Sequence, residues 1–145
     1  MKAIEPASGV IEHGTHILPL RVYYEDTDFS GSVYHATYLK FLERGRSEYL
    51  RALGVLHQHL AAREQTTWAV KRLTIEYLKP ARLEDSVTVH THRGEVKGAR
   101  VLIRQEIHRG HDVLVTADVE VCLVSGGKPQ RISADIRARL ESSST

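Results

Sequence analysis

The sequence contains one cysteine and no long hydrophobic run. Cys122 is the only cysteine of the 145 residues, so an internal disulfide is excluded, which suits a reducing compartment. No apolar stretch approaches the roughly 18 to 20 residues that span a bilayer. The first fifteen residues contain acids and a proline instead of a hydrophobic segment, so we expect no signal peptide. These absences predict a cytoplasmic protein with no membrane span.

The sequence also lacks an excess of charge of either sign. The formal net charge is +2, and the basic residues are scattered, so we expect no nucleic-acid partner. Apolar residues make up 41% of the chain, which is typical of a folded protein that buries a core. We expect a flexible lead-in over residues 1–15, one domain over 16–140 and a frayed tail over 141–145.

Hydrophobic periodicity predicts one strand, one long helix and then four more strands. Apolar residues at spacings of three and four indicate the helix, and alternation with a period of two indicates the strands. Lys97-Gly98 and Arg109-Gly110 fall between strands and are typical of hairpin turns. The expected strands are 16–24, 67–77, 87–92, 101–107 and 113–123, and the expected helices are 38–53, a short 56–64 and a closing 129–140. The fold class is therefore α+β, an antiparallel sheet of about five strands wrapped around a helix.

The long helix has an apolar stripe and a charged side. We expect Gly45 in the stripe, where its missing side chain would allow the backbone to approach the sheet closely. Gly45 would otherwise cost about 1 kcal/mol relative to alanine in a helix. The other stripe residues are Tyr38, Phe41, Leu42, Tyr49 and Leu53. The residues expected on the solvent side are Glu43, Arg44, Arg46, Glu48 and Arg51.

The segment YYEDTDFSGSVYHATYLKF, residues 23–41, concentrates acids immediately before this helix. The simplest interpretation is capping, because acids are favourable near the positive end of a helix. Hydrolysis of an activated acyl group offers another, since it needs a base or nucleophile, oxyanion donors and a water-excluded slot. Asp28 would supply the carboxylate, and free backbone N–H groups near Gly31 to His35 would supply the donors. Gly31 would let a carbonyl group approach the backbone.

Other chemistries have weaker signals. The sequence has no G-x-S-x-G, P-loop or G-x-G-x-x-G motif. Cys122 lies in an expected strand and is interpreted as a structural residue. The histidine pairs His57/His59, His90/His92 and His108/His111 could start a metal site, but further ligands are missing. We therefore expect no metal and no other cofactor.

The segment RVYYEDTDFSGSVYHATYLKFLERGRSEYLRALG, residues 21–54, resembles the signature of hotdog-fold acyl-CoA thioesterases of the 4-hydroxybenzoyl-CoA thioesterase type. It is most similar to the branch associated with the bacterial Tol-Pal system. LTIEYLKPARLEDSVTV, residues 73–89, resembles the same branch. The resemblance implies a helix surrounded by a curled sheet, a homodimer with continuous sheets that is often doubled to a homotetramer, and active sites at the subunit interface.

The resemblance also implies roles for individual residues. Asp28 is the catalytic carboxylate, and Tyr24 matches a hydroxyl position beside it. His35 matches the histidine of the site, and its backbone N–H matches the donor to the thioester oxygen. Gly31 and Val33 match the substrate-binding part of the motif. Asp26 stays a loop or capping acid. Phe29-Ser30 and Ser32 depart from the pattern of the relatives.

The predicted function is therefore hydrolysis of short-chain or aromatic acyl-CoA to the free acid and CoA. Because CoA is polyanionic, the candidate contacts to it are Lys71, Arg72, Lys79 and Arg82, although a solvated surface position is the better explanation of each. Two alternatives stay open: dehydration of an acyl thioester on the same fold, and a non-catalytic partner of acyl carrier protein or of an envelope complex.

Overall fold

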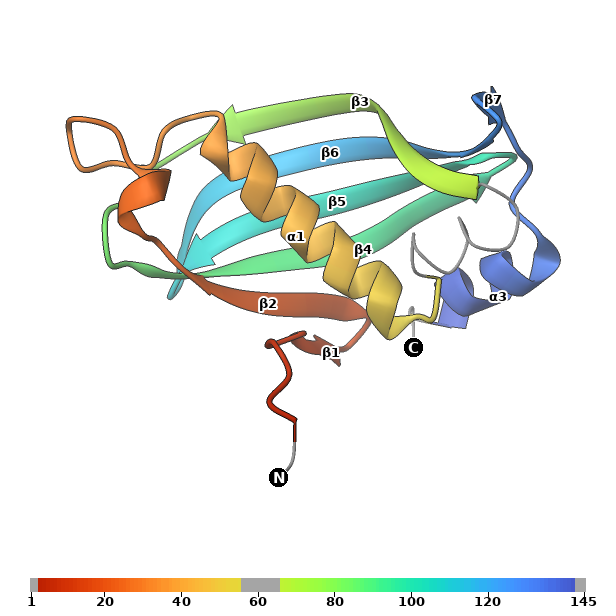
Figure 1. Cartoon of the computed structure of the whole chain (residues 1–145), viewed down its shortest axis with the longest axis horizontal. Coiled ribbons are helices and arrows are strands. Elements are labelled where there is room, and N and C mark those ends of the chain that lie inside the picture. Colours follow the sequence, from red (N-terminus) through yellow and green to blue (C-terminus); the bar gives the residue numbers. More distant parts are fainter. Residues whose placement is uncertain (1–2, 56–65, 143–145) are drawn as a thin grey trace.

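A computed structural model describes residues 3–55 and 66–142, in which a curved sheet wraps around one long helix (Figure 1). The expected short helix over 56–64 lies outside the described residues. The helices are α1 Thr37–Ala52 and α3 Ala134–Ser142, with a 3-10 turn, η1, at Tyr24–Asp26. The strands are β1 Val10–Glu12, β2 Thr15–Arg21, β3 Thr66–Tyr77, β4 Ser86–Lys97, β5 Arg100–Arg109, β6 Asp112–Ser125 and β7 Lys128–Pro129.

The sheet is antiparallel throughout and is not closed. Its strand order is β1-β2-β4-β5-β6-β3, and β7 pairs with β6. Gly98 and Gly110 adopt positive φ angles of 62° and 61° in the turns between β4, β5 and β6, as the two hairpins require. The five long strands and the α+β class confirm the prediction. Within the described residues the twelve-residue strand β3 pairs with β6 alone, and no other described strand lies along its second edge.

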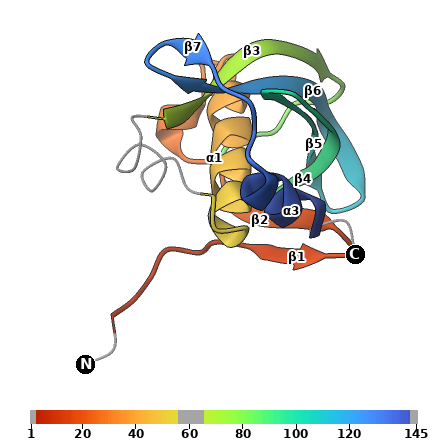
Figure 2. The ribbon, with the colours of Figure 1, turned by 90° about the vertical axis from the view of Figure 1, so that its right-hand side faces the viewer.

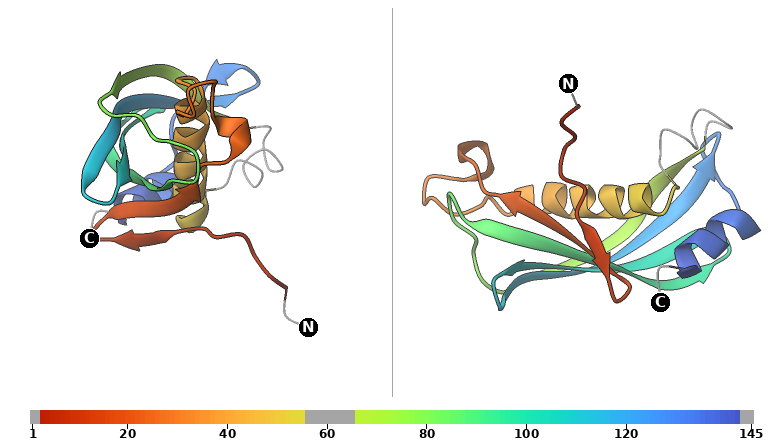
Figure 3. Two further views of the ribbon diagram at one scale, coloured as in Figure 1. Left: turned by 90° about the vertical axis from the view of Figure 1, so that its left-hand side faces the viewer. Right: turned by 90° about the horizontal axis from the view of Figure 1, so that it is seen from below.

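The sheet curls around α1, which lies along its concave side (Figures 2 and 3). The start of α1 and η1 lie at one end of the molecule, and α3 lies at the other end. Apolar side chains of α1 and the inner face of the sheet form a single hydrophobic core. The loops at the start of α1 are therefore built on a rigid scaffold, as functional loops commonly are.

Both ends of the chain are more ordered than expected. Residues 10–12 form β1, which pairs with β2 through a turn in which His13 and Gly14 have positive φ angles. The buried His16 ring is hydrogen-bonded to the Ser8 carbonyl at 2.7 Å, which holds the preceding segment against β2. Near the other end α3 continues to Ser142, with Leu140 buried in the core. Three residues are too few for a periodic signal of β1, whereas the closing helix was expected and α3 runs two residues past its expected end at 140.

Gly45 and Arg46 test the expected helix faces. A Cβ atom on Gly45 would lie 2.5 Å from Cγ1 of Val89, so the predicted close approach to the sheet is confirmed. The expectation for Arg46 was wrong, because this residue is only 8% exposed. It lies four residues after Leu42 and three before Tyr49, which places it in the buried stripe despite its charge.

Candidate active site

The segment before α1 folds into a tight turn at residues 27–33. The N–H of Asp28 donates to the Ser32 carbonyl at 2.9 Å, and the N–H of Gly31 donates to the Asp28 carbonyl at 3.1 Å. Thr27 and Val33 pair across its base. Gly31 has a φ angle of 80°, and no heavy atom lies within 4 Å of where its Cβ would stand. One side of the turn therefore has room for a ligand that approaches the backbone at Gly31.

The Asp28 side chain is exposed on this turn in the single chain. Its Oδ1 accepts hydrogen bonds from the Ser30 hydroxyl at 2.6 Å and from the Ser30 N–H at 2.9 Å. The hydroxyl of Ser30, followed by its backbone N–H, lowers the pKa of the Asp28 carboxyl below its ordinary value. Asp28 is therefore ionised at neutral pH. Ser30, which departs from the pattern of the relatives, thus has a physical role.

Asp26 has the structural role expected of it. It is only 6% exposed, and its Oδ2 accepts the N–H of Tyr23 at 2.8 Å. This bond closes η1 in the manner of a capping residue. The two acids of the D-T-D motif therefore differ: Asp26 stabilises the loop, whereas the Asp28 carboxylate is available to a ligand.

His35 lies just before α1 with an unoccupied backbone donor. Its carbonyl accepts the Tyr77 hydroxyl at 2.9 Å, and its ring lies 4.4 Å from the ring of Tyr34. Among the described residues, no acceptor pairs with the N–H of His35 or Ala36. Unpaired amides at the start of a helix attract a negative charge or a polarised carbonyl oxygen. This part of the segment can therefore supply oxyanion donors.

A second loop, residues 78–85, holds the turn in place. The N–H of Val33 donates to the Ala81 carbonyl at 2.9 Å, and the N–H of Leu83 donates to the Gly31 carbonyl at 3.0 Å. The buried Tyr38 hydroxyl accepts the N–H of Ala81 at 2.9 Å and so links this loop to α1. These bonds fix the backbone around Gly31 from a distant part of the chain.

The structure brings some of the predicted residues together and leaves others apart. Asp28, Gly31 and Val33 share one turn, although the Val33 side chain is 5% exposed and belongs to the core. No hydrogen bond joins Asp28 to His35 among the described contacts. Tyr24 is 82% exposed, and its hydroxyl has no hydrogen-bond partner in the described part of the chain.

The four candidate CoA contacts also separate. The Arg82 guanidinium donates to Oγ of Ser32 at 3.1 Å and so lies against the turn, which gives Ser32 a role. Lys79 pairs with Asp112 at 3.1 Å, and Lys71 and Arg72 are exposed on β3. Only Arg82 of these four is in contact with the candidate site.

The sequence did not point to Tyr38 and Tyr77 as site residues. Tyr38 was expected only as a core residue, and Tyr77 only as the last residue of a strand face. Both hydroxyls bond the backbone of loops that flank the start of α1. A tyrosine at the end of a strand, where its hydroxyl can reach a neighbouring loop, is the signal that could have found Tyr77.

The histidines of the two described pairs do not converge with further metal ligands. His90 and His108 stack with ring centroids 3.9 Å apart, and they bond Thr88 and Glu106 respectively. Over residues 3–55 and 66–142, no three side chains of the kinds that bind metals converge. His57 and His59 lie outside the described residues. No helix in the described part of the chain combines the length and apolar character needed to cross a membrane.

With the fold and the turn established, comparison with known proteins defines the class. The Thioesterase superfamily matches residues 30–116, more than half of the chain, and the chain belongs to this family of hydrolases. The arrangement of helix and sheet is the hotdog fold of its members.

Two relatives and one solved structure show where in the family the similarity is high. The chain is 46% identical over 115 residues to the acyl-CoA thioesterase YbgC of Haemophilus influenzae, covering 79% of this chain and 85% of that protein. It is 41% identical over 106 residues to the acyl-CoA thioester hydrolase YbgC of Escherichia coli, covering 73% and 78%. The crystal structure of a probable thioesterase from Bartonella henselae matches with a TM-score of 0.79 and 42% identity, covering 82% of this chain and 99% of that one.

Proposed function

We propose that the protein is an acyl-CoA thioesterase that converts short-chain or aromatic acyl-CoA to the free acid and CoA. One observation carries the proposal: an ionised, accessible carboxylate at Asp28 lies in the same short segment as the unpaired amides before α1. The two YbgC relatives, which are named for this activity, support the same reaction.

Asp28 acts on the thioester carbonyl in one of two ways. As a general base it takes a proton from water while the water oxygen bonds the carbonyl carbon. As a nucleophile it bonds the carbon itself, and water then cleaves the mixed anhydride. In both routes the C–S bond breaks, and the CoA thiolate takes up a proton. The imidazole of His35 can deliver that proton or orient the water, and the Tyr24 hydroxyl assists the carboxylate.

The amides of His35 and Ala36 stabilise the oxyanion that forms on the carbonyl oxygen. Such donors are effective because they are fixed before the reaction starts. The Tyr77 hydroxyl, bonded to the His35 carbonyl at 2.9 Å, restrains the peptide that ends in the Ala36 N–H. The bond from Arg82 to Ser32 supports a role for Arg82 in binding a phosphate of CoA. Acyl carrier protein is an alternative carrier of the same thioester.

A panel of acyl-CoA substrates tests the reaction directly. We expect release of free thiol, followed with a colorimetric thiol reagent, from at least one of the acetyl to octanoyl series or from benzoyl-CoA. A dehydratase would instead remove water from a 3-hydroxyacyl-CoA without releasing thiol, and a non-catalytic protein would do neither. Absence of thiol release across the panel, with the protein folded by circular dichroism, would overturn the proposal.

We further propose that the working unit is a homodimer, or a homotetramer built from such dimers, in which β3 strands pair across a two-fold axis. Over residues 68–77, β3 has β6 as its single strand partner in the described sheet, and the second edge of such a strand readily adds another strand. Asp28 is exposed in the single chain, whereas the acyl group and the oxyanion are better stabilised in a site sheltered from bulk water. A second subunit would cover the turn and complete the site.

Lys71 offers a selective way to break this pairing. It has no partner on β6, because the register is shifted between Val70 and Arg72. Proline is tolerated at bulges of edge strands but removes an N–H that a further strand needs. We expect Lys71→Pro to be monomeric by light scattering and to lose at least tenfold in kcat/KM, whereas Lys71→Ala stays dimeric and active. A monomeric wild-type protein at micromolar concentration would contradict the proposal.

A further inference from the structure

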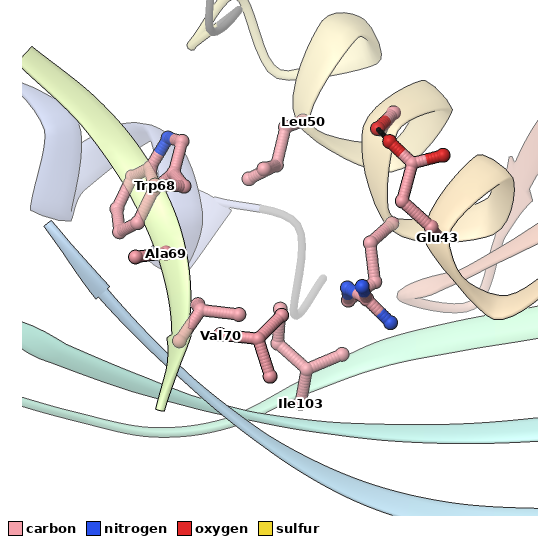
Figure 4. Close-up of a pocket in the computed structure, with 9 residues that line it drawn as sticks. Glu43, Leu50, Trp68, Ala69, Val70 and Ile103 are labelled. Atoms are coloured by element: carbon pink, nitrogen blue, oxygen red, sulfur yellow. Dashed lines mark hydrogen bonds between the residues drawn. The ribbon is translucent and has the colours of Figure 1, made fainter. Parts of the chain in front are cut away.

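A cavity of about 140 Å³ lies between α1, the first half of β3 and the floor of the sheet (Figure 4). Glu43, Arg46, Ser47 and Leu50 line it from α1, and Trp68, Ala69 and Val70 line it from β3. Ile103 of β5 and Val121 of β6 form its floor. An engineered cavity of about 150 Å³ in another protein holds benzene, so this space suits a group of that size.

The cavity has largely apolar walls, one buried cation, Arg46, and one exposed acid, Glu43, at its edge. Leu50, Trp68, Ile103 and Val121 are all buried, and none of them offers a charge. The Arg46 guanidinium, on a residue that is 92% buried, is held by a hydrogen bond from Nη1 to Oε1 of Gln105 at 3.1 Å. A guanidinium carries five N–H donors, so most of those of Arg46 have no partner among the described residues.

Arg46 lines the cavity, and its donors without a partner among the described residues are accessible to a ligand. Among the described residues, Nδ1 of His16 is the only side-chain nitrogen or oxygen that is fully buried and has no hydrogen-bond partner. Any nitrogen of Arg46 without a partner is therefore accessible to solvent or to a ligand. The carboxylate of Glu43 accepts the Ser47 hydroxyl at 2.9 Å, and no ion pair joins it to Arg46 among the described contacts. Burial lowers the pKa of Arg46, and the charge of Glu43 offsets this effect only in part.

A buried and unpaired guanidinium is costly unless an anion or strong acceptor joins it. Its planar pair of donors matches a carboxylate or a phosphate, and the apolar walls favour the less highly charged carboxylate. We propose that this cavity binds a small organic carboxylate, with a ring or branched chain against Trp68 and Leu50 and the carboxylate on Arg46. The carboxylate could belong to a free acid or to the far end of a dicarboxylic acyl-CoA. The acyl-CoA alternative rests on the proposed function, and the free-acid alternative does not.

Benzoate tests the free acid, with benzamide as a neutral probe of the same shape. By calorimetry we expect saturable benzoate binding at least tenfold tighter than benzamide binding, because the carboxylate gains charge-assisted hydrogen bonds. Arg46→Met should remove this preference, and Arg44→Met, which removes an exposed charge from the same helix, should retain it. Ala69→Leu should block binding by filling the cavity while Arg46 stays in place. This variant tests the same site if Arg46→Met fails to fold.

Adipyl-CoA and hexanoyl-CoA, which have the same chain length, test the acyl source. If the distal carboxylate binds Arg46, then Arg46→Met lowers kcat/KM for adipyl-CoA at least tenfold and changes that for hexanoyl-CoA less than twofold. Benzoate binding without this selective effect identifies the free acid as the ligand. The inference is overturned if benzoate does not bind and Arg46→Met affects both substrates equally. Hydrolysis of hexanoyl-CoA by the wild type would then still support the proposed function.

Discussion

Replacing Asp28 with asparagine should reduce kcat on the best acyl-CoA substrate by at least about a hundredfold. The amide is nearly isosteric with the carboxylate and can still accept the hydrogen bonds of Ser30. It can neither take a proton from water nor attack the carbonyl, and general-base catalysis alone contributes roughly 10² to 10⁴ in rate. Steady-state thiol release on purified Asp28→Asn measures the effect.

Glu25→Gln is the matched control for Asp28→Asn. Glu25 is an exposed acid three residues earlier, so its replacement removes the same charge from the same segment. We expect this variant to keep activity within about twofold. If Asp28→Asn also stays within tenfold of the wild type, the carboxylate is not part of the chemistry.

Ser30→Ala tests the effect of Ser30 on the carboxyl group. Losing the hydroxyl donor should raise the pKa of Asp28 and move the acidic limb of the profile of kcat/KM against pH to higher pH.

Sequence periodicity was sufficient for the parts of the fold that repeat. The stripe of α1 and the alternation of β3 to β6 run over many residues, so single exceptions do not obscure them. The three residues of β1 are too few for such a signal. Arg46 was assigned to solvent by its charge, whereas its position in the helix places it inside. The charge of Arg46 predicted exposure, whereas the packing of α1 against the sheet determines that this residue is buried.

The sequence could point to those residues of the candidate site that lie close together along the chain. Asp28, Gly31 and His35 lie within eight consecutive residues, so a sequence motif can carry them. The groups that hold them come from far away: Tyr77 is 42 residues from His35, and Ala81 is 43 residues from Tyr38. Contacts at such separations depend on the folded sheet. The surface that we propose to cover Asp28 is harder to predict, because it would come from a second subunit and not from the same folded chain.

The backbone N–H of His35 should matter more than its side chain, and His35→Pro against His35→Ala separates the two. Proline removes the N–H, whereas alanine keeps it and removes the imidazole. Loss of one oxyanion donor costs roughly 10² to 10³ in kcat, so we expect His35→Pro to fall at least a hundredfold. His35→Ala should fall about tenfold or less, with kcat and KM measured by thiol release.

The proline variant needs evidence that it is folded, and Tyr77→Phe supplies an independent check. Proline near the start of a helix is well tolerated, so its melting temperature should stay within a few degrees of that of His35→Ala. Tyr77→Phe leaves every backbone amide in place but removes the hydroxyl that restrains the His35 carbonyl. If the amides act as proposed, this variant should lower kcat with little change in KM, because the donors matter most in the transition state. Equal losses in His35→Pro and His35→Ala would instead assign the effect to the imidazole and exclude the His35 amide as the oxyanion donor.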